Sequence, residues 1–157
     1  MEIISKLNNT SPREIIKLLG LRFYRFDAAR KVIIPFVKQP RPKKWVFIVA
    51  CCNSGTTLLT KLLGTHSDIS SLPEEGVWLT NRLPRSEDFG WPRVWCMCKD
   101  KVYMNEKNSN VNVDKLKKEW GFWFDSKKDV FLEKSSLNSI RMRWLQKYFH
   151  PSYFISV

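Results

Sequence analysis

The chain has 157 residues, and its 43% hydrophobic and 27% charged residues are typical of a single globular domain that can bury a core. An aromatic content of 13%, with seven Trp, excludes long disorder as the main state. The 27 Lys and Arg exceed the 15 Asp and Glu, and the net charge of +12 favours acidic ligands, polyanions or anionic lipid surfaces.

Residues 1–44 are a basic segment, with 11 Lys and Arg against three acidic residues, and we expect a helical lead-in. Ser11 and Pro12 are typical of a helix start, and Glu14 completes a capping box. Prolines within 40–42 mark the boundary of the segment. This segment could contact a membrane surface or another subunit, and the sequence does not decide between them. Nucleic-acid binding is not expected, because a basic helix is more often a solvated face.

Residues 45–157 are expected to form the main domain. The continuous apolar run 45–50 predicts a central parallel strand that is buried on both faces. Small and polar residues at 51–57 predict a turn, and four Leu with helical spacing at 58–63 predict a helix that ends at Gly64. The resulting unit is a P-loop-like strand, turn and helix.

The middle of the chain has weaker patterns. Residues 69–72 predict a short second strand. Residues 77–112 contain Pro and many Asn, Ser and Lys, and we expect loops with short helices there, within a variable insertion at 77–124 on the acceptor side of the domain. Within it, 113–124 has helical character because Leu and Trp recur with helical spacing.

The last third predicts a strand at 130–132, an amphipathic helix at 137–148 and a second buried strand at 153–157. A strand–helix–strand crossover implies a parallel sheet, so the predicted fold is a three-layer α/β domain. Ligands of such sheets bind beyond the carboxyl ends of the strands. Because no loop follows Val157, we expect a truncated chain whose domain is incomplete at its C-terminal side.

The turn after the first strand is a candidate anion site. It places backbone N–H groups at a helix N-terminus, where the helix dipole favours negative charge. It lacks a Walker A signature, since Ala50 stands at the first Gly position and Thr56 at the Lys position, which argues against ATP or GTP hydrolysis. A simple helix-capping turn is the alternative. The candidate ligand-binding residues are Asn53, Ser54, Gly55, Thr56 and Thr57.

Two blocks of the chain resemble the sulfotransferases that use 3'-phosphoadenosine-5'-phosphosulfate (PAPS). Residues 45–59 look like an apolar strand followed by the R-S-G-T-T-L-L loop of that family. Residues 66–69 resemble its H-P-x-I segment, and the paired Glu at 74–75 is similar to that of the tyrosylprotein branch. Residues 131–138 and Arg141 look like the E-K-[ST]-P-x-N-x-x-R block of the family. Further matching positions up to 155 look like the strand that follows this block.

The resemblance implies transfer of a sulfuryl group from PAPS, as co-substrate, to a hydroxyl or amine of a small-molecule, saccharide or peptide acceptor. It implies that residues 53–57 bind the 5'-phosphosulfate. Glu75, or its neighbour Glu74, would be the base for the acceptor, with Glu75 preferred. Lys134 would stabilise the bridging oxygen as charge leaves the sulfuryl group.

Two departures from the family pattern lead to an alternative. Asn53 stands where the family has Arg or Lys, and the 3'-phosphate motif would follow Val157. The alternative is a catalytically inactive or fragmentary protein that binds a nucleotide or a protein partner only. The enzyme requires the side chains of Glu75 and Lys134 both to point toward the turn at 51–57. If the two residues lie far apart in the structure, the enzymatic hypothesis fails.

We expect neither a membrane span nor a metal site. The longest apolar runs, such as 46–52, have seven residues or so, whereas a span needs about 20. The N-terminus lacks the apolar stretch of a signal peptide, which predicts a cytoplasmic protein with free thiols. Cys96 and Cys98 have poor spacing for zinc, and Cys51 and Cys52 are expected to be small buried residues at a strand end.

Overall fold

The computed structural model describes residues 20, 24, 27–107 and 110–157. The chain divides into two compact units, Met1–Phe36 and Val37–Val157, so the boundary falls eight residues before the expected one. The described part of the first unit includes helix α3 (Asp27–Ile33) and the 3-10 helix η1 (Ile34–Phe36). The predicted helix start at Ser11 lies outside the described residues.

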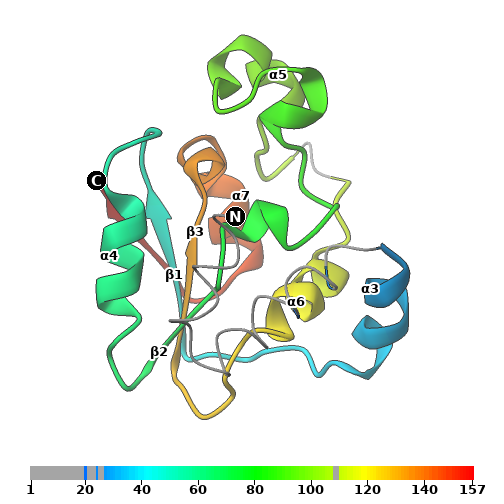
Figure 1. Cartoon of the computed structure of the whole chain (residues 1–157), viewed down its shortest axis with the longest axis vertical. Helices are drawn as coiled ribbons and strands as arrows, with labels where there is room; N and C mark the ends of the chain where they lie inside the picture. The colour runs from blue at the N-terminus through cyan, green and yellow to red at the C-terminus, as the bar shows by residue number, and fades with distance from the viewer. Residues whose placement is uncertain (1–19, 21–23, 25–26, 108–109) are drawn as a thin grey trace, which may run out of the picture. The chain divides into compact units, whose positions relative to one another are not determined.

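The second unit contains a four-stranded, all-parallel sheet. Figure 1 labels three of its strands, β1, β2 and β3. Its strands lie in the order β2-β3-β1-β4, which confirms the predicted α/β fold. The central strand β1 pairs with β3 in a register that aligns Trp45 with Phe131 and Ile48 with Lys134. The strands are β1 (Lys44–Val49), β2 (Ile69–Ser71), β3 (Val130–Lys134) and β4 (Ser152–Ser156).

Helices lie on both faces of the sheet (Figure 1). Helix α4 (Thr56–Leu63) connects β1 to β2, whereas α6 (Val113–Gly121) precedes β3 and α7 (Met142–Tyr148) precedes β4. The chain crosses the sheet in one direction from β1 to β2 and in the opposite direction from β2 through β3 to β4. Since parallel crossovers are right-handed, this reversal places α4 on one face and the two later helices on the other.

Aromatic side chains fill the layer between the sheet and the helices α6 and α7. The Trp45 ring lies 4.6 Å from the ring of Phe131, its partner in register on β3. Trp120 of α6 lies 5.4 Å from Phe149, which in turn lies 5.5 Å from Phe47. All five side chains are buried, so this face holds the main core.

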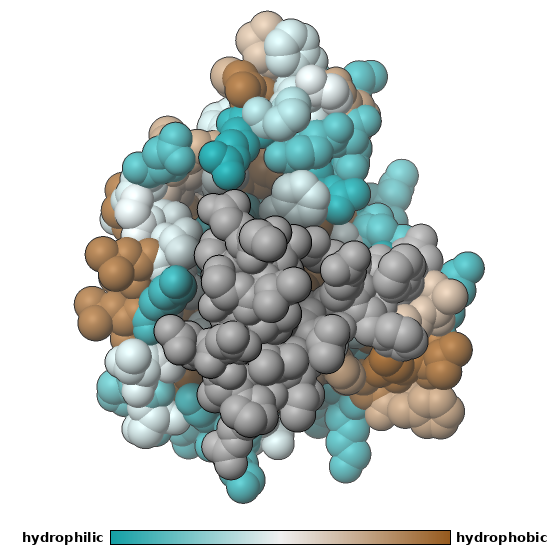
Figure 2. Space-filling model, viewed as in Figure 1, coloured by the Kyte–Doolittle hydropathy of each residue, from teal (hydrophilic) through white to brown (hydrophobic). Residues whose placement is uncertain are grey.

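The other face of the sheet, on which α4 lies, buries fewer side chains. Helix α4 has no buried residue, and its predicted apolar stripe divides between two sides. Leu59 and Leu63 are half-buried, whereas Leu58 and Leu62 are 73% and 65% exposed. Figure 2 shows these apolar side chains on the outer side of α4. Residues four apart lie on the same side of a helix, which explains the division.

The predicted helix at 137–148 is interrupted. A 3-10 helix, η5 (Ser136–Ile140), precedes α7, and Arg141 lies between them with φ −127° and ψ 7°. The Arg141 guanidinium is buried and donates hydrogen bonds to the carbonyl oxygens of Val102 and Pro84. Burial lowers the pKa of Arg141 to about 10. This side chain therefore holds segment 77–112 against the sheet domain.

Segment 77–112 contains short helices, in agreement with the sequence. They are η2 (Gly76–Trp78), η3 (Ser86–Phe89), η4 (Trp95–Cys98) and α5 (Lys99–Val102). Among the described residues, none of the helices is both long and apolar enough to cross a membrane.

A pair of Leu→Ala variants tests the unequal burial of the two faces. Leu132 in β3 is fully buried, so we expect Leu132→Ala to lower the free energy of unfolding by about 2–5 kcal/mol. Leu58→Ala removes the same atoms from an exposed site and should change it by less than about 0.5 kcal/mol. Urea denaturation measures both values, and equal losses would contradict this description of the core.

Candidate functional site

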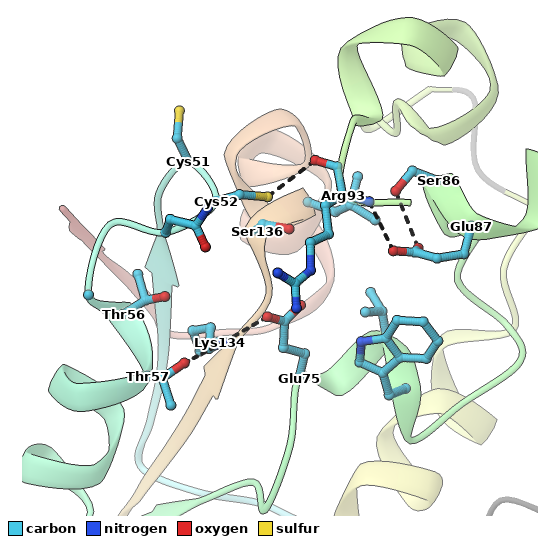
Figure 3. Close-up of a pocket in the computed structure, with 15 residues that line it drawn as sticks. Cys51, Cys52, Thr56, Thr57, Glu75, Ser86, Glu87, Arg93, Lys134 and Ser136 are labelled. Carbon is cyan, nitrogen blue, oxygen red and sulfur yellow. Dashed lines mark hydrogen bonds and ion pairs between the residues drawn. The ribbon is translucent and has the colours of Figure 1, made fainter. Parts of the chain in front are cut away.

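A cavity of about 280 Å³ lies at the carboxyl edge of the sheet, beside the ends of β1 and β3 (Figure 3). The connection after β1 leaves toward α4, and the connection after β3 leaves toward α7 on the other face. Such a reversal between neighbouring strands opens a crevice in parallel sheets. Residues of four segments line the cavity, namely 51–57, 75–78, 86–93 and 134–137.

The loop after β1 forms one wall. Gly55 caps α4 with φ +78°, a left-handed conformation that favours Gly, and its carbonyl accepts the N–H groups of Leu58 and Leu59. The N–H groups of Thr56 and Thr57 are in the first turn, where no partner within the helix exists. They carry the positive end of the helix dipole at this wall of the cavity.

The predicted loop residues do not all face the cavity. Asn53, Gly55, Thr56 and Thr57 line it, whereas the Ser54 hydroxyl donates a hydrogen bond to the Cys51 carbonyl oxygen at 2.8 Å. Asn53 has φ +65°, a conformation that Asn tolerates better than most residues.

Three separate segments meet in one polar cluster. Lys134 Nζ donates hydrogen bonds to Glu75 Oε1 at 2.7 Å and to Thr57 Oγ1 at 3.3 Å (Figure 3). The Lys134 and Glu75 side chains are 15% and 28% exposed, so the ion pair is largely shielded from water. Glu74 is half-buried and does not line the cavity. The structure thus brings Glu75 and Lys134 together beside the N-terminus of α4.

The buried Glu133, for which the sequence predicted no role, holds the neighbouring segments of this cluster in place. Its buried carboxylate accepts hydrogen bonds from the Gly76 N–H at 2.8 Å, the Ser135 hydroxyl at 2.5 Å and the Asn138 amide at 2.5 Å. Burial raises the pKa of Glu133, and these three donors oppose the shift. A Glu that directly follows Phe131 and Leu132 in a buried strand is the sequence signal that could have identified this role.

The cysteines of the loop differ from expectation. Cys51 is exposed and Cys52 is half-buried, so the prediction that both are buried at a strand end is wrong. The reason is that β1 ends at Val49 and the loop has left the sheet before it reaches them. Cys52 Sγ instead donates a hydrogen bond to the carbonyl oxygen of Arg93 at 3.3 Å, joining the loop to the opposite wall.

Within the described part of the chain, no three His, Cys, Asp or Glu side chains gather as metal ligands. No protein-family model, curated protein or solved structure matches the chain.

Glu133 leads to a pH prediction. Its folded-state pKa lies above its ordinary value of 4.5, so the folded protein binds more protons than the unfolded protein between the two values. The contribution of Glu133 to the free energy of unfolding should therefore fall as pH rises through this window. Glu133→Gln cannot ionise and should lack that fall, measured by urea denaturation from pH 4 upward.

Asp100→Asn is the matched control, because it removes a carboxylate from an exposed position. This variant keeps Glu133 and should therefore keep the fall in the free energy of unfolding as pH rises. A Glu133→Gln variant with the same pH dependence as the wild type would contradict the assigned shift.

Proposed function

We propose that this chain transfers a sulfuryl group from PAPS to a hydroxyl or amine acceptor at the cavity beside α4. The observation that carries the proposal is the ion pair between Glu75 and Lys134, 2.7 Å apart at the carboxyl edge of the sheet. Residues 59 positions apart in the sequence meet where a base and a cation are both required. A carboxylate alone, or a cation alone, would not support the reaction.

The residues present fit the anionic end of the co-substrate. The first-turn N–H groups of α4 and the hydroxyls of Thr56 and Thr57 are suitable donors for phosphosulfate oxygens. The cavity volume of about 280 Å³ lies just below the usual range of ligand pockets, about 300–1,000 Å³, and suits the phosphosulfate end rather than a whole nucleotide. In the proposed complex the cavity therefore holds the 5' end of PAPS.

The proposed step is an in-line displacement at sulfur. Glu75 accepts the proton of the acceptor hydroxyl, whose oxygen forms a new bond to sulfur. The bond from sulfur to the bridging oxygen breaks, and 3'-phosphoadenosine-5'-phosphate (PAP) leaves with the electron pair. Lys134 carries three N–H donors, of which one is directed at Glu75 and one at Thr57. The third can stabilise the charge on the bridging oxygen.

Binding and transfer can be measured separately. Calorimetric titration of PAP measures binding, and PAP release from PAPS with a panel of phenol, saccharide and tyrosine-peptide acceptors measures transfer. Glu75→Gln should keep PAP binding and lower the transfer rate about 10²–10⁴-fold, because it removes the base. Lys134→Gln should lower it about 10²–10³-fold. Glu74→Gln should retain transfer, since its side chain does not line the cavity.

If the wild-type chain binds PAP but never converts PAPS to PAP with any acceptor, the proposed transferase activity is contradicted. That result would favour the alternative of a nucleotide-binding protein. A chain that binds neither compound would contradict both. Equal losses in Glu74→Gln and Glu75→Gln would remove the assignment of the base to Glu75.

A further inference from the structure

The loop that leads into the N-terminus of α4 carries no positive side chain. Residues 51–57 contain neither Lys nor Arg. Among the residues that line the cavity, Lys134 and Arg93 are the two cations, and they come from opposite walls. The charge of Lys134 is already balanced by Glu75. Glu87 is a second carboxylate of the lining, on the same wall as Arg93. A ligand with several negative charges therefore requires the guanidinium of Arg93 as its cation.

Arg93 is available for this role. Within the part of the chain that the structure describes, no carboxylate lies within 4.0 Å of its guanidinium, whereas Lys134 has Glu75 as its partner. Figure 3 shows the Arg93 side chain extending over the cavity rather than away from it.

The backbone at Arg93 has an uncommon conformation. The Val94 N–H donates to the Trp91 carbonyl oxygen at 3.1 Å, which closes a turn with Pro92 and Arg93 at its centre. Arg93 has φ +63°. A turn with Pro at the second position and positive φ at the third favours Gly or Asn at that third position. An Arg in this place is a strained choice, and strain of this kind clusters at functional sites.

Two hydrogen bonds fix the turn beside the loop. The Arg93 carbonyl oxygen accepts from Cys52 Sγ at 3.3 Å, and the Arg93 N–H donates to Glu87 Oε1 at 3.2 Å (Figure 3). The first bond joins the turn directly to the loop that ends at the N-terminus of α4. The position of the guanidinium is thereby linked to the wall on which the anion would rest.

We infer that Arg93 is a binding residue for the phosphosulfate group, supplying across the cavity the positive charge that loop 51–57 lacks. This inference rests on the proposed function. The planar guanidinium can donate two parallel hydrogen bonds to oxygens of one phosphate or sulfate group, which an ammonium group cannot. The anion is then held between the first-turn N–H groups of α4 on one side and Arg93 on the other.

Calorimetric titration with PAP tests the inference on the full chain. Arg93→Gln should weaken PAP binding about tenfold or more, as expected for the loss of hydrogen bonds to a charged group. Arg93→Lys should weaken it less, because it keeps the charge. Lys61→Gln removes one positive charge from an exposed position of α4 outside the cavity and should bind PAP as the wild type does.

Arg93→Gly separates binding from folding. Gly suits the left-handed conformation, so this variant should unfold at the same temperature as the wild type or higher, and yet bind PAP as weakly as Arg93→Gln. Wild-type affinity in Arg93→Gly or Arg93→Gln would overturn the inference while Glu75 and Lys134 keep their proposed roles. A lower unfolding temperature in both variants would assign Arg93 a structural role and also overturn it. A wild type that does not bind PAP would overturn the proposed function and the inference together.

Discussion

A carboxylate buried at the end of β3 organises the candidate site. Glu133 accepts a hydrogen bond from the backbone of Gly76, 57 residues away in the sequence, and so holds a loop against the strand end. A Cβ atom at position 76 would lie 2.7 Å from Glu133 Oε1 and 2.8 Å from the ring of Trp120, so this approach requires Gly. Because Glu75 precedes Gly76 and Lys134 follows Glu133, the same contact brings the base candidate and the cation together.

The alternation of a strand explains why neighbouring residues of β3 have opposite roles. Glu133 points to the face packed by α6 and α7, and Lys134 points to the face of α4. The first is therefore surrounded by core and supports the loop, whereas the second reaches the open end of α4. The order of the strands completes the arrangement, because the connections after β1 and β3 leave to opposite faces and keep the crevice open.

The sequence predicted the strands well because buried parallel strands are continuous apolar runs, as in 45–50. It also placed the turn and Lys134 at strand ends, where a parallel sheet brings them to one edge. The break at Arg141 was missed because a buried guanidinium, not helical periodicity, decides it. Arg93 was missed because its place at the cavity depends on a local turn and on the Cys52 contact, neither of which has a periodic pattern.

Two residues other than Gly have positive φ in the described part of the chain, and both line the cavity. Asn53 belongs to a residue type that tolerates the left-handed region, so the loop before α4 adopts its conformation at little cost. Arg93 does not, and a left-handed residue of that kind costs about 1–3 kcal/mol. The strain is therefore confined to the turn, where Cys52 and Glu87 hold it. In the proposed site, the backbone N–H groups at the start of α4 position the anion. The Arg93 side chain, on the other wall, neutralises its charge.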